Sequence, residues 1–128
     1  MTDKTNTKLI FEKLVRVFFK HQMQLKMFHF QTKNYGAHKA SDSYLEEFAN
    51  NFDKFMEVAQ GTFGKLESQN MTFSFDTLND NTITEELENF INLLKQLDAY
   101  LIRNSDLLNI RDEMVGNAQQ LKYLLSFK

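Results

Sequence analysis

The chain has 128 residues, of which 42% are hydrophobic and 25% are charged, and its formal net charge is -2. This length and composition fit one compact domain over residues 1–128, and the charge balance gives no drive toward nucleic acid. The sequence contains no cysteine, which excludes disulfides, thiolate metal sites and cysteine nucleophiles. The first residues are too polar for a signal peptide and no apolar run approaches the roughly 18 residues of a membrane span, so we expect a soluble, cytoplasmic protein.

The first predicted helix begins after Thr7 and ends at about Thr32, because apolar residues recur there at steps of three and four. The sequence has no proline and only 4 glycines, so little in it interrupts a long helix. His21 falls in the middle of the apolar face, where we expect a buried, hydrogen-bonded histidine and not a metal ligand. The segment 33–36 interrupts the pattern, and we expect Gly36 to adopt a positive φ there.

The second predicted helix spans about 37–63, and the irregular segment 61–81 that follows reads as a long crossover. Thr82 and Glu85 have the spacing of a capping box, which predicts a third helix to about residue 103. A fourth helix is expected after the short connection at 104–106, ending near residue 126. Four amphipathic helices joined by short, long and short connections predict an all-α four-helix bundle with one long crossover between the second and third helices.

The five candidate metal ligands are His29, His38, Asp42, Asp53 and Glu57, which lie within 29 residues of one another. The last four are separated by steps of four, eleven and four residues, which places them on one stripe of the second helix. Carboxylates combined with imidazoles suit divalent iron, manganese or zinc better than an organic cofactor. The spacing therefore predicts a metal site, and no catalytic group beyond the metal ligands is indicated.

The same residues also have ordinary structural interpretations. His29 would complement the dipole at the end of its helix, and each acid taken singly could be a solvated surface charge. A metal site inside the bundle would require Glu-x-x-His pairs on two helices, and the sequence contains none. We therefore expect any site to lie on the flank of the second helix, where a further helix or a second subunit could meet it.

The stretch from Leu25 to Phe30, Gly36, and the series from His38 to Glu57 together resemble the Dps-type miniferritins of the ferritin-like superfamily. In that family an early helix ends in a histidine followed by an aromatic residue, and the next helix carries a histidine, an acid four residues later, and Asp-x-x-x-Glu. The chain is also similar to a small, uncharacterised ferritin-like group that keeps His-Phe-Gln-Thr and His-Lys-Ala-Ser, as at residues 29–32 and 38–41.

The resemblance implies a ferroxidase centre between two subunits of a two-fold dimer, which could belong to a larger shell. His29, His38 and Asp42 of one chain would face Asp53 and Glu57 of its mate. Fe(II) would bind there and be oxidised to Fe(III) by oxygen or peroxide, with zinc or manganese as alternative metals.

Three features depart from the family. The interval between His29 and His38 is about three residues shorter than expected, and the crossover is shortened too. A lysine-rich tail for DNA is also missing, since Lys4 and Lys8 alone do not form one. The alternative hypothesis is therefore a non-catalytic helical bundle that acts as an adaptor or scaffold without metal.

Overall fold

The computed structural model describes residues 4–67 and 70–127, with side chains from residue 7 onward, and within these residues it contains helices and no strands. The helices are α1 (Lys4–Gln31), α2 (Tyr35–Phe63), α3 (Ile83–Lys95), the four-residue α4 (Asp98–Leu101) and α5 (Ser105–Leu125). The expectation of an all-helical bundle with a long connection between α2 and α3 is confirmed. None of these helices is long and apolar enough to cross a membrane.

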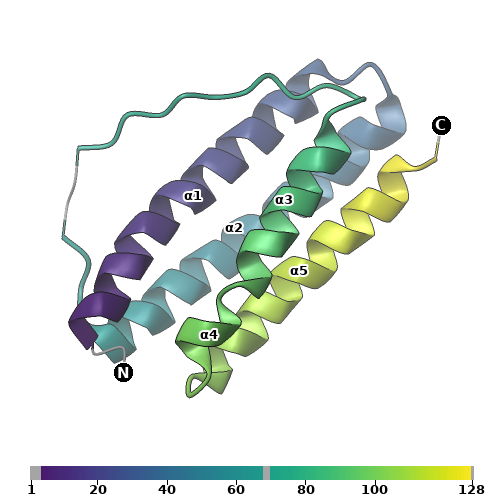
Figure 1. Cartoon of the computed structure of the whole chain (residues 1–128). Coiled ribbons are helices and arrows are strands. Elements are labelled where there is room, and N and C mark those ends of the chain that lie inside the picture. The colour runs from purple at the N-terminus through teal and green to yellow at the C-terminus, as the bar shows by residue number, and fades with distance from the viewer. Residues whose placement is uncertain (1–3, 68–69, 128) are drawn as a thin grey trace.

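The helices form a bundle in which α2 packs against both α1 and α5, and α3 packs against α5 (Figure 1). α1 and α5 run in one direction and α2 and α3 in the other, so the crossover has to return along the full length of the bundle beside α1 (Figure 1). Leu78 anchors the end of the crossover, with only 6% of its surface exposed. The expected third helix is interrupted by a turn at residues 96–97, and α4 follows it.

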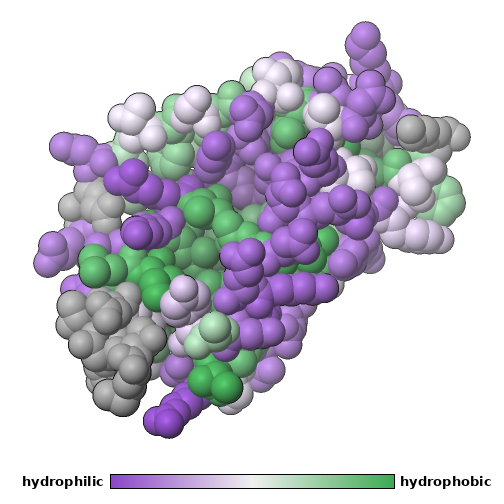
Figure 2. Space-filling view, in the orientation of Figure 1, coloured by the Kyte–Doolittle hydropathy of each residue, from purple (hydrophilic) through white to green (hydrophobic). Residues whose placement is uncertain are grey.

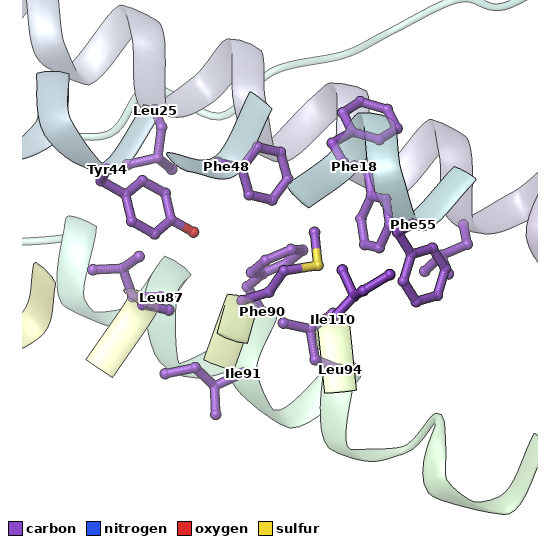
Figure 3. Close-up of a cluster of buried hydrophobic side chains, with 14 of the residues drawn as sticks. Phe18, Leu25, Tyr44, Phe48, Phe55, Leu87, Phe90, Ile91, Leu94 and Ile110 are labelled. Atoms are coloured by element: carbon purple, nitrogen blue, oxygen red, sulfur yellow. The ribbon is translucent and has the colours of Figure 1, made fainter. Parts of the chain in front are cut away.

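Phenylalanine supplies much of the core volume, as the composition indicated. Phe18 is fully buried, and its ring lies within 6.0 Å of the rings of Phe48, Phe52, Phe55 and Phe90 in edge-on arrangements. Such edge-to-face pairs are favourable because the positive ring edge meets the negative ring face. Figure 3 shows these rings converging from different helices onto the aliphatic side chains of α3. The core therefore fixes the relative rotation of α1 and α2, which carry the candidate site.

Two local expectations are wrong. Gly36 does not take a positive φ. Among the described residues, only Gly64 has a positive φ, at 102°. Asn34 instead caps α2 by accepting a hydrogen bond from the Ala37 N–H, so the helix already includes Gly36. A Cβ on Gly36 would lie 3.1 Å from Asn34 Oδ1, which gives glycine a steric role at this position.

Thr82 precedes α3 but makes no side-chain cap hydrogen bond, so the capping box with Glu85 does not form. The side chain of Asn79 organises this turn instead, since its Oδ1 accepts from the backbone N–H groups of Asn81 and Thr82. Asp80 in the same turn accepts from the Thr32 hydroxyl at 2.5 Å, which joins the end of the crossover to the connection between α1 and α2.

Candidate metal site

His29 and His38 are brought together where α1 ends and α2 begins. Their rings are stacked, with centroids 4.0 Å apart and planes 16° from parallel. His29 Nδ1 lies 2.9 Å from the carbonyl oxygen of His38, and His38 Nδ1 lies 2.8 Å from the carbonyl oxygen of His29. We call this reciprocal arrangement the histidine clasp. It exists because the short connection places the last turn of α1 beside the first turn of α2.

The clasp determines which nitrogen of each ring carries a hydrogen. A carbonyl oxygen can only accept a hydrogen bond, so Nδ1 of both His29 and His38 must donate. In the neutral imidazole the lone pair is then on Nε2. No described residue donates a hydrogen bond to either Nε2 atom, so both rings retain the atom through which a histidine binds a metal.

Asp42 lies close to the clasp, one turn along α2 from His38. Its Oδ1 is 3.9 Å from His29 Nε2, and its side chain is 65% exposed whereas that of His29 is 8% exposed. An exposed carboxylate can turn toward a cation at little cost, while the buried imidazole is held in place. The structure thus brings together three of the five predicted ligands: His29, His38 and Asp42.

Asp53 and Glu57 lie elsewhere on the same helix. Eleven residues of α-helix separate Asp42 from Asp53, which is about 16 Å along the axis. Both acids are exposed, and they lie one turn apart on the same stripe of α2 as Asp42. Within the described part of one chain, no group of three or more His, Cys, Asp or Glu side chains has the geometry to hold a metal ion. The described part of a single chain therefore does not arrange the five predicted ligands around one cation, and His29, His38 and Asp42 alone do not form a metal-binding group there either.

Ser41 is a site residue that the spacing did not indicate. It is fully buried, and its hydroxyl lies 3.0 Å from both His29 Nδ1 and the carbonyl oxygen of His38. Its position one residue before Asp42 was visible in the sequence, but serine is not a metal ligand of the expected kind. Its contact with the His29 ring becomes visible only in the structure, where α2 places the hydroxyl within hydrogen-bond distance of His29 Nδ1.

The third histidine of the sequence, His21, lies in the centre of the bundle. His21 is 2% exposed, and its ring stacks on Phe90 with centroids 3.7 Å apart. Its Nδ1 donates to Glu86 Oε2 at 2.8 Å, and its Nε2 accepts from the Tyr44 hydroxyl at 2.7 Å. Figure 3 shows the Tyr44 hydroxyl pointing into the core. Both ring nitrogens are thus occupied, and the expectation of a buried, hydrogen-bonded histidine is confirmed.

The surroundings of His21 change its protonation. Burial lowers the pKa of His21 from 6.5, because the core solvates the charged imidazolium poorly, and the nearby Glu86 carboxylate partly opposes this effect. Burial also raises the pKa of Tyr44 above 10.0. Gln24 extends the network: it donates to Glu86 and accepts from the Asp76 N–H of the crossover. This cluster joins α1, α2, α3 and the crossover.

Comparison with known proteins identifies a family for this chain but no biochemical activity. No curated protein and no solved structure matches the chain. Residues 29–125 match a family described as a family of unknown function, DUF5856. The matched region starts at His29 and includes all five predicted ligands. Because it covers well over half of the sequence, the chain belongs to the DUF5856 family.

Proposed function

We propose that the protein is a Dps-like miniferritin, a ferritin-like helical bundle that binds Fe(II) between two copies of the chain and oxidises it. The observation that carries the proposal is the histidine clasp, in which both Nε2 atoms are free and His29 Nε2 lies 3.9 Å from Asp42 Oδ1. Hydrogen bonds at Nδ1 fix the tautomer of a metal-binding histidine and make Nε2 a better donor. A mixed nitrogen and oxygen donor set of this kind suits divalent iron.

The second copy supplies what one chain lacks. Asp53 and Glu57 of the partner subunit would complete the ligand set in a two-fold dimer, where each chain gives its histidine end to one site and its acidic pair to the other. Carboxylates from the partner would offset the charge of Fe(II), and the imidazoles would orient it. Each Fe(II) loses one electron, and one peroxide accepts two electrons and two protons as its O–O bond breaks to give two waters.

The surface around the clasp supports a second copy as the occupant. The last turns of α1, beside the clasp, expose two large apolar side chains, Met27 at 45% and Phe30 at 65%. A groove of about 560 Å³ lies between α1 and α2 and is bordered by Asp42. Exposed apolar surface next to an incomplete set of ligands is the arrangement expected where a subunit interface also forms a metal site.

Anaerobic Fe(II) titration tests the proposal. The wild type should bind Fe(II) at a fixed stoichiometry, and the double variant His38→Ala, Asp42→Ala should lose that binding. Glu47→Ala is the matched control, because Glu47 is an exposed acid on another side of α2 and should leave binding unchanged. Unchanged stoichiometry in the double variant would rule the site out.

Mixing two defective variants tests whether the site is shared between subunits. The His38→Ala, Asp42→Ala chain is refolded together with an Asp53→Ala, Glu57→Ala chain in equal amounts. Random pairing makes half of the dimers mixed, and each mixed dimer has one intact site of two, so about a quarter of the wild-type sites should return. A site built within one chain would give no recovery at all.

The alternative is a non-catalytic bundle that serves as an adaptor or scaffold without metal. It is favoured by one observation, which is that the described residues of a single chain hold no complete metal-binding group. In that case the purified protein contains no iron, and all five residues can be replaced with no loss beyond stability. Metal analysis by mass spectrometry, run with light scattering on the same sample, separates the two functions.

A further inference from the structure

The hydroxyl of Ser41 contacts both halves of the histidine clasp. Its hydroxyl lies 3.0 Å from the carbonyl oxygen of His38, three residues earlier in α2, and must donate there because that oxygen only accepts. The remaining lone pairs of the hydroxyl oxygen face His29 Nδ1, also at 3.0 Å. The His29 N–H is therefore shared between two acceptors, the carbonyl oxygen of His38 and the hydroxyl of Ser41.

The two imidazoles of the clasp differ in this respect. His38 Nδ1 has one acceptor, the carbonyl oxygen of His29 at 2.8 Å, and Ser41 does not contact that nitrogen. His29 is also the more buried ring, and its Nε2 is the atom nearest to Asp42. Two acceptors at different positions restrict rotation of a ring more strongly than one does. The orientation of His29, and with it the direction of its free Nε2, thus depends on Ser41.

We propose that Ser41 is a positioning residue of the metal site, which shares the His29 Nδ1–H with the carbonyl oxygen of His38 and so aims the free Nε2 of His29 toward Asp42 before any metal arrives. The metal-binding part of this inference rests on the proposed function, whereas the orientation of the ring can be measured without metal. Groups that hydrogen-bond to a metal-ligating histidine typically change metal affinity by about 10- to 100-fold. Ser41 is fully buried, which removes competition from water for its hydrogen bonds.

Nitrogen-15 NMR of the metal-free protein tests the inference at about pH 8, where an ordinary imidazole is neutral. In the wild type, both His29 and His38 should show a protonated Nδ1 and an unprotonated Nε2. Ser41→Ala leaves the His38 carbonyl oxygen as an acceptor at 2.9 Å, so the tautomer of His29 should stay the same. The His29 Nδ1 signal should nevertheless shift, and its proton should exchange faster with water, because one of its two acceptors is lost, with His38 as the internal reference. Ser41→Thr restores a hydroxyl and should restore the wild-type spectrum, while Ser43→Ala, an exposed serine on the same helix, should change nothing.

Fe(II) affinity provides the second measurement on the same variants. Ser41→Ala should weaken binding by about tenfold at unchanged stoichiometry, because Ser41 orients a ligand and is not one itself. If the His29 nitrogens of Ser41→Ala stay as in the wild type and affinity changes less than about twofold, the inference is overturned. If the wild type binds no Fe(II), the proposed function fails, and a change in the His29 Nδ1 signal of Ser41→Ala would still establish that Ser41 orients His29.

Discussion

The protein contains two histidine clusters that are built in opposite ways. In the central cluster, both nitrogens of His21 are occupied by Glu86 and Tyr44, and the ring is covered by Phe90. In the clasp, each ring uses only Nδ1, which donates to a backbone carbonyl oxygen and, in His29, also to the Ser41 hydroxyl. Burial is similar for His21 and His29, at 2% and 7% exposure, so exposure alone does not distinguish them. The two clusters differ in how many nitrogens of each ring take part in hydrogen bonds.

The difference indicates what each cluster can do. A histidine with both nitrogens satisfied inside the core stabilises the arrangement of helices and has no atom left for a ligand. A histidine whose Nδ1 is held and whose Nε2 is free is ready to bind a cation. In the clasp, backbone carbonyl oxygens and the Ser41 hydroxyl all bind at Nδ1, so Nε2 of each ring is left without a hydrogen bond from any described residue.

Replacing each histidine by alanine should separate the clusters most clearly. We expect His21→Ala to lower the free energy of unfolding by about 3 kcal/mol, because it opens a cavity in the core and leaves the Tyr44 hydroxyl and Glu86 without a partner. His29→Ala should cost about 1 kcal/mol, since Ser41 can still donate to the carbonyl oxygen of His38. Urea denaturation followed by circular dichroism measures both. Equal losses would mean that the two clusters stabilise the fold in the same way.

The pH dependence of stability should come from the central cluster. The pKa of His21 is lowered from 6.5 in the folded protein, so below pH 6.5 the unfolded chain binds a proton that the folded chain does not. Stability contributed by neutral His21 is therefore complete above pH 6.5 and is lost as the pH falls toward the folded pKa, with a slope of up to about 1.4 kcal/mol per pH unit.

The variant His21→Gln isolates this contribution. Its urea-denaturation free energy should vary less with pH than that of the wild type between about pH 7 and 5. Equal slopes for the two proteins would show that the pH dependence arises outside the central cluster.

Helical periodicity was sufficient to predict most of the fold. Apolar residues at steps of three and four located α1, α2 and α5 to within a few residues, and the glycines and asparagines of the crossover marked where regularity stops. The errors occurred where a nearby asparagine side chain makes hydrogen bonds that the sequence pattern had assigned to other residues. Asn34 extends α2 backward through Gly36, and Asn79 accepts from the Thr82 N–H that Glu85 would have used in a capping box. Such choices depend on turn geometry that spacing does not encode.

The candidate site was predicted only in part. Spacing selected His29, His38 and Asp42, which the fold does bring together, but the clasp depends on backbone carbonyls and could not be read from side chains. Arg111 shows the opposite failure: it reads as a surface residue, yet it is 6% exposed and donates to the carbonyl oxygen of Leu94 and to Asp98. Convergence of Asp53 and Glu57 on the clasp requires a second chain, which no pattern within one sequence determines.

A smaller effect should distinguish two tyrosines. Tyr44→Phe removes the only donor to His21 Nε2 among the described residues, and we expect it to cost about 1 kcal/mol, because a buried acceptor is left unsatisfied. Tyr35→Phe is the matched control: Tyr35 is 75% exposed and stacks near His38. The exposed Tyr35 hydroxyl can hydrogen-bond to water, so the melting temperature of Tyr35→Phe should equal that of the wild type. A loss in Tyr35→Phe as large as in Tyr44→Phe would contradict the assignment of the central network.

The smallest effect on stability is expected at the acids farthest from the clasp. Asp53→Asn, Glu57→Gln alters only exposed side chains, so without iron its melting temperature should stay within about 2 °C of the wild type. With Fe(II) at about a hundredfold excess over Kd, the wild type should gain about 2.7 kcal/mol, and the variant should gain much less, because its partner ligands are neutral. A marked drop in melting temperature without iron would place these acids in the fold itself. If Fe(II) stabilised the variant as much as the wild type, Asp53 and Glu57 would not be ligands. The metal would then bind at the clasp without acids from a second chain.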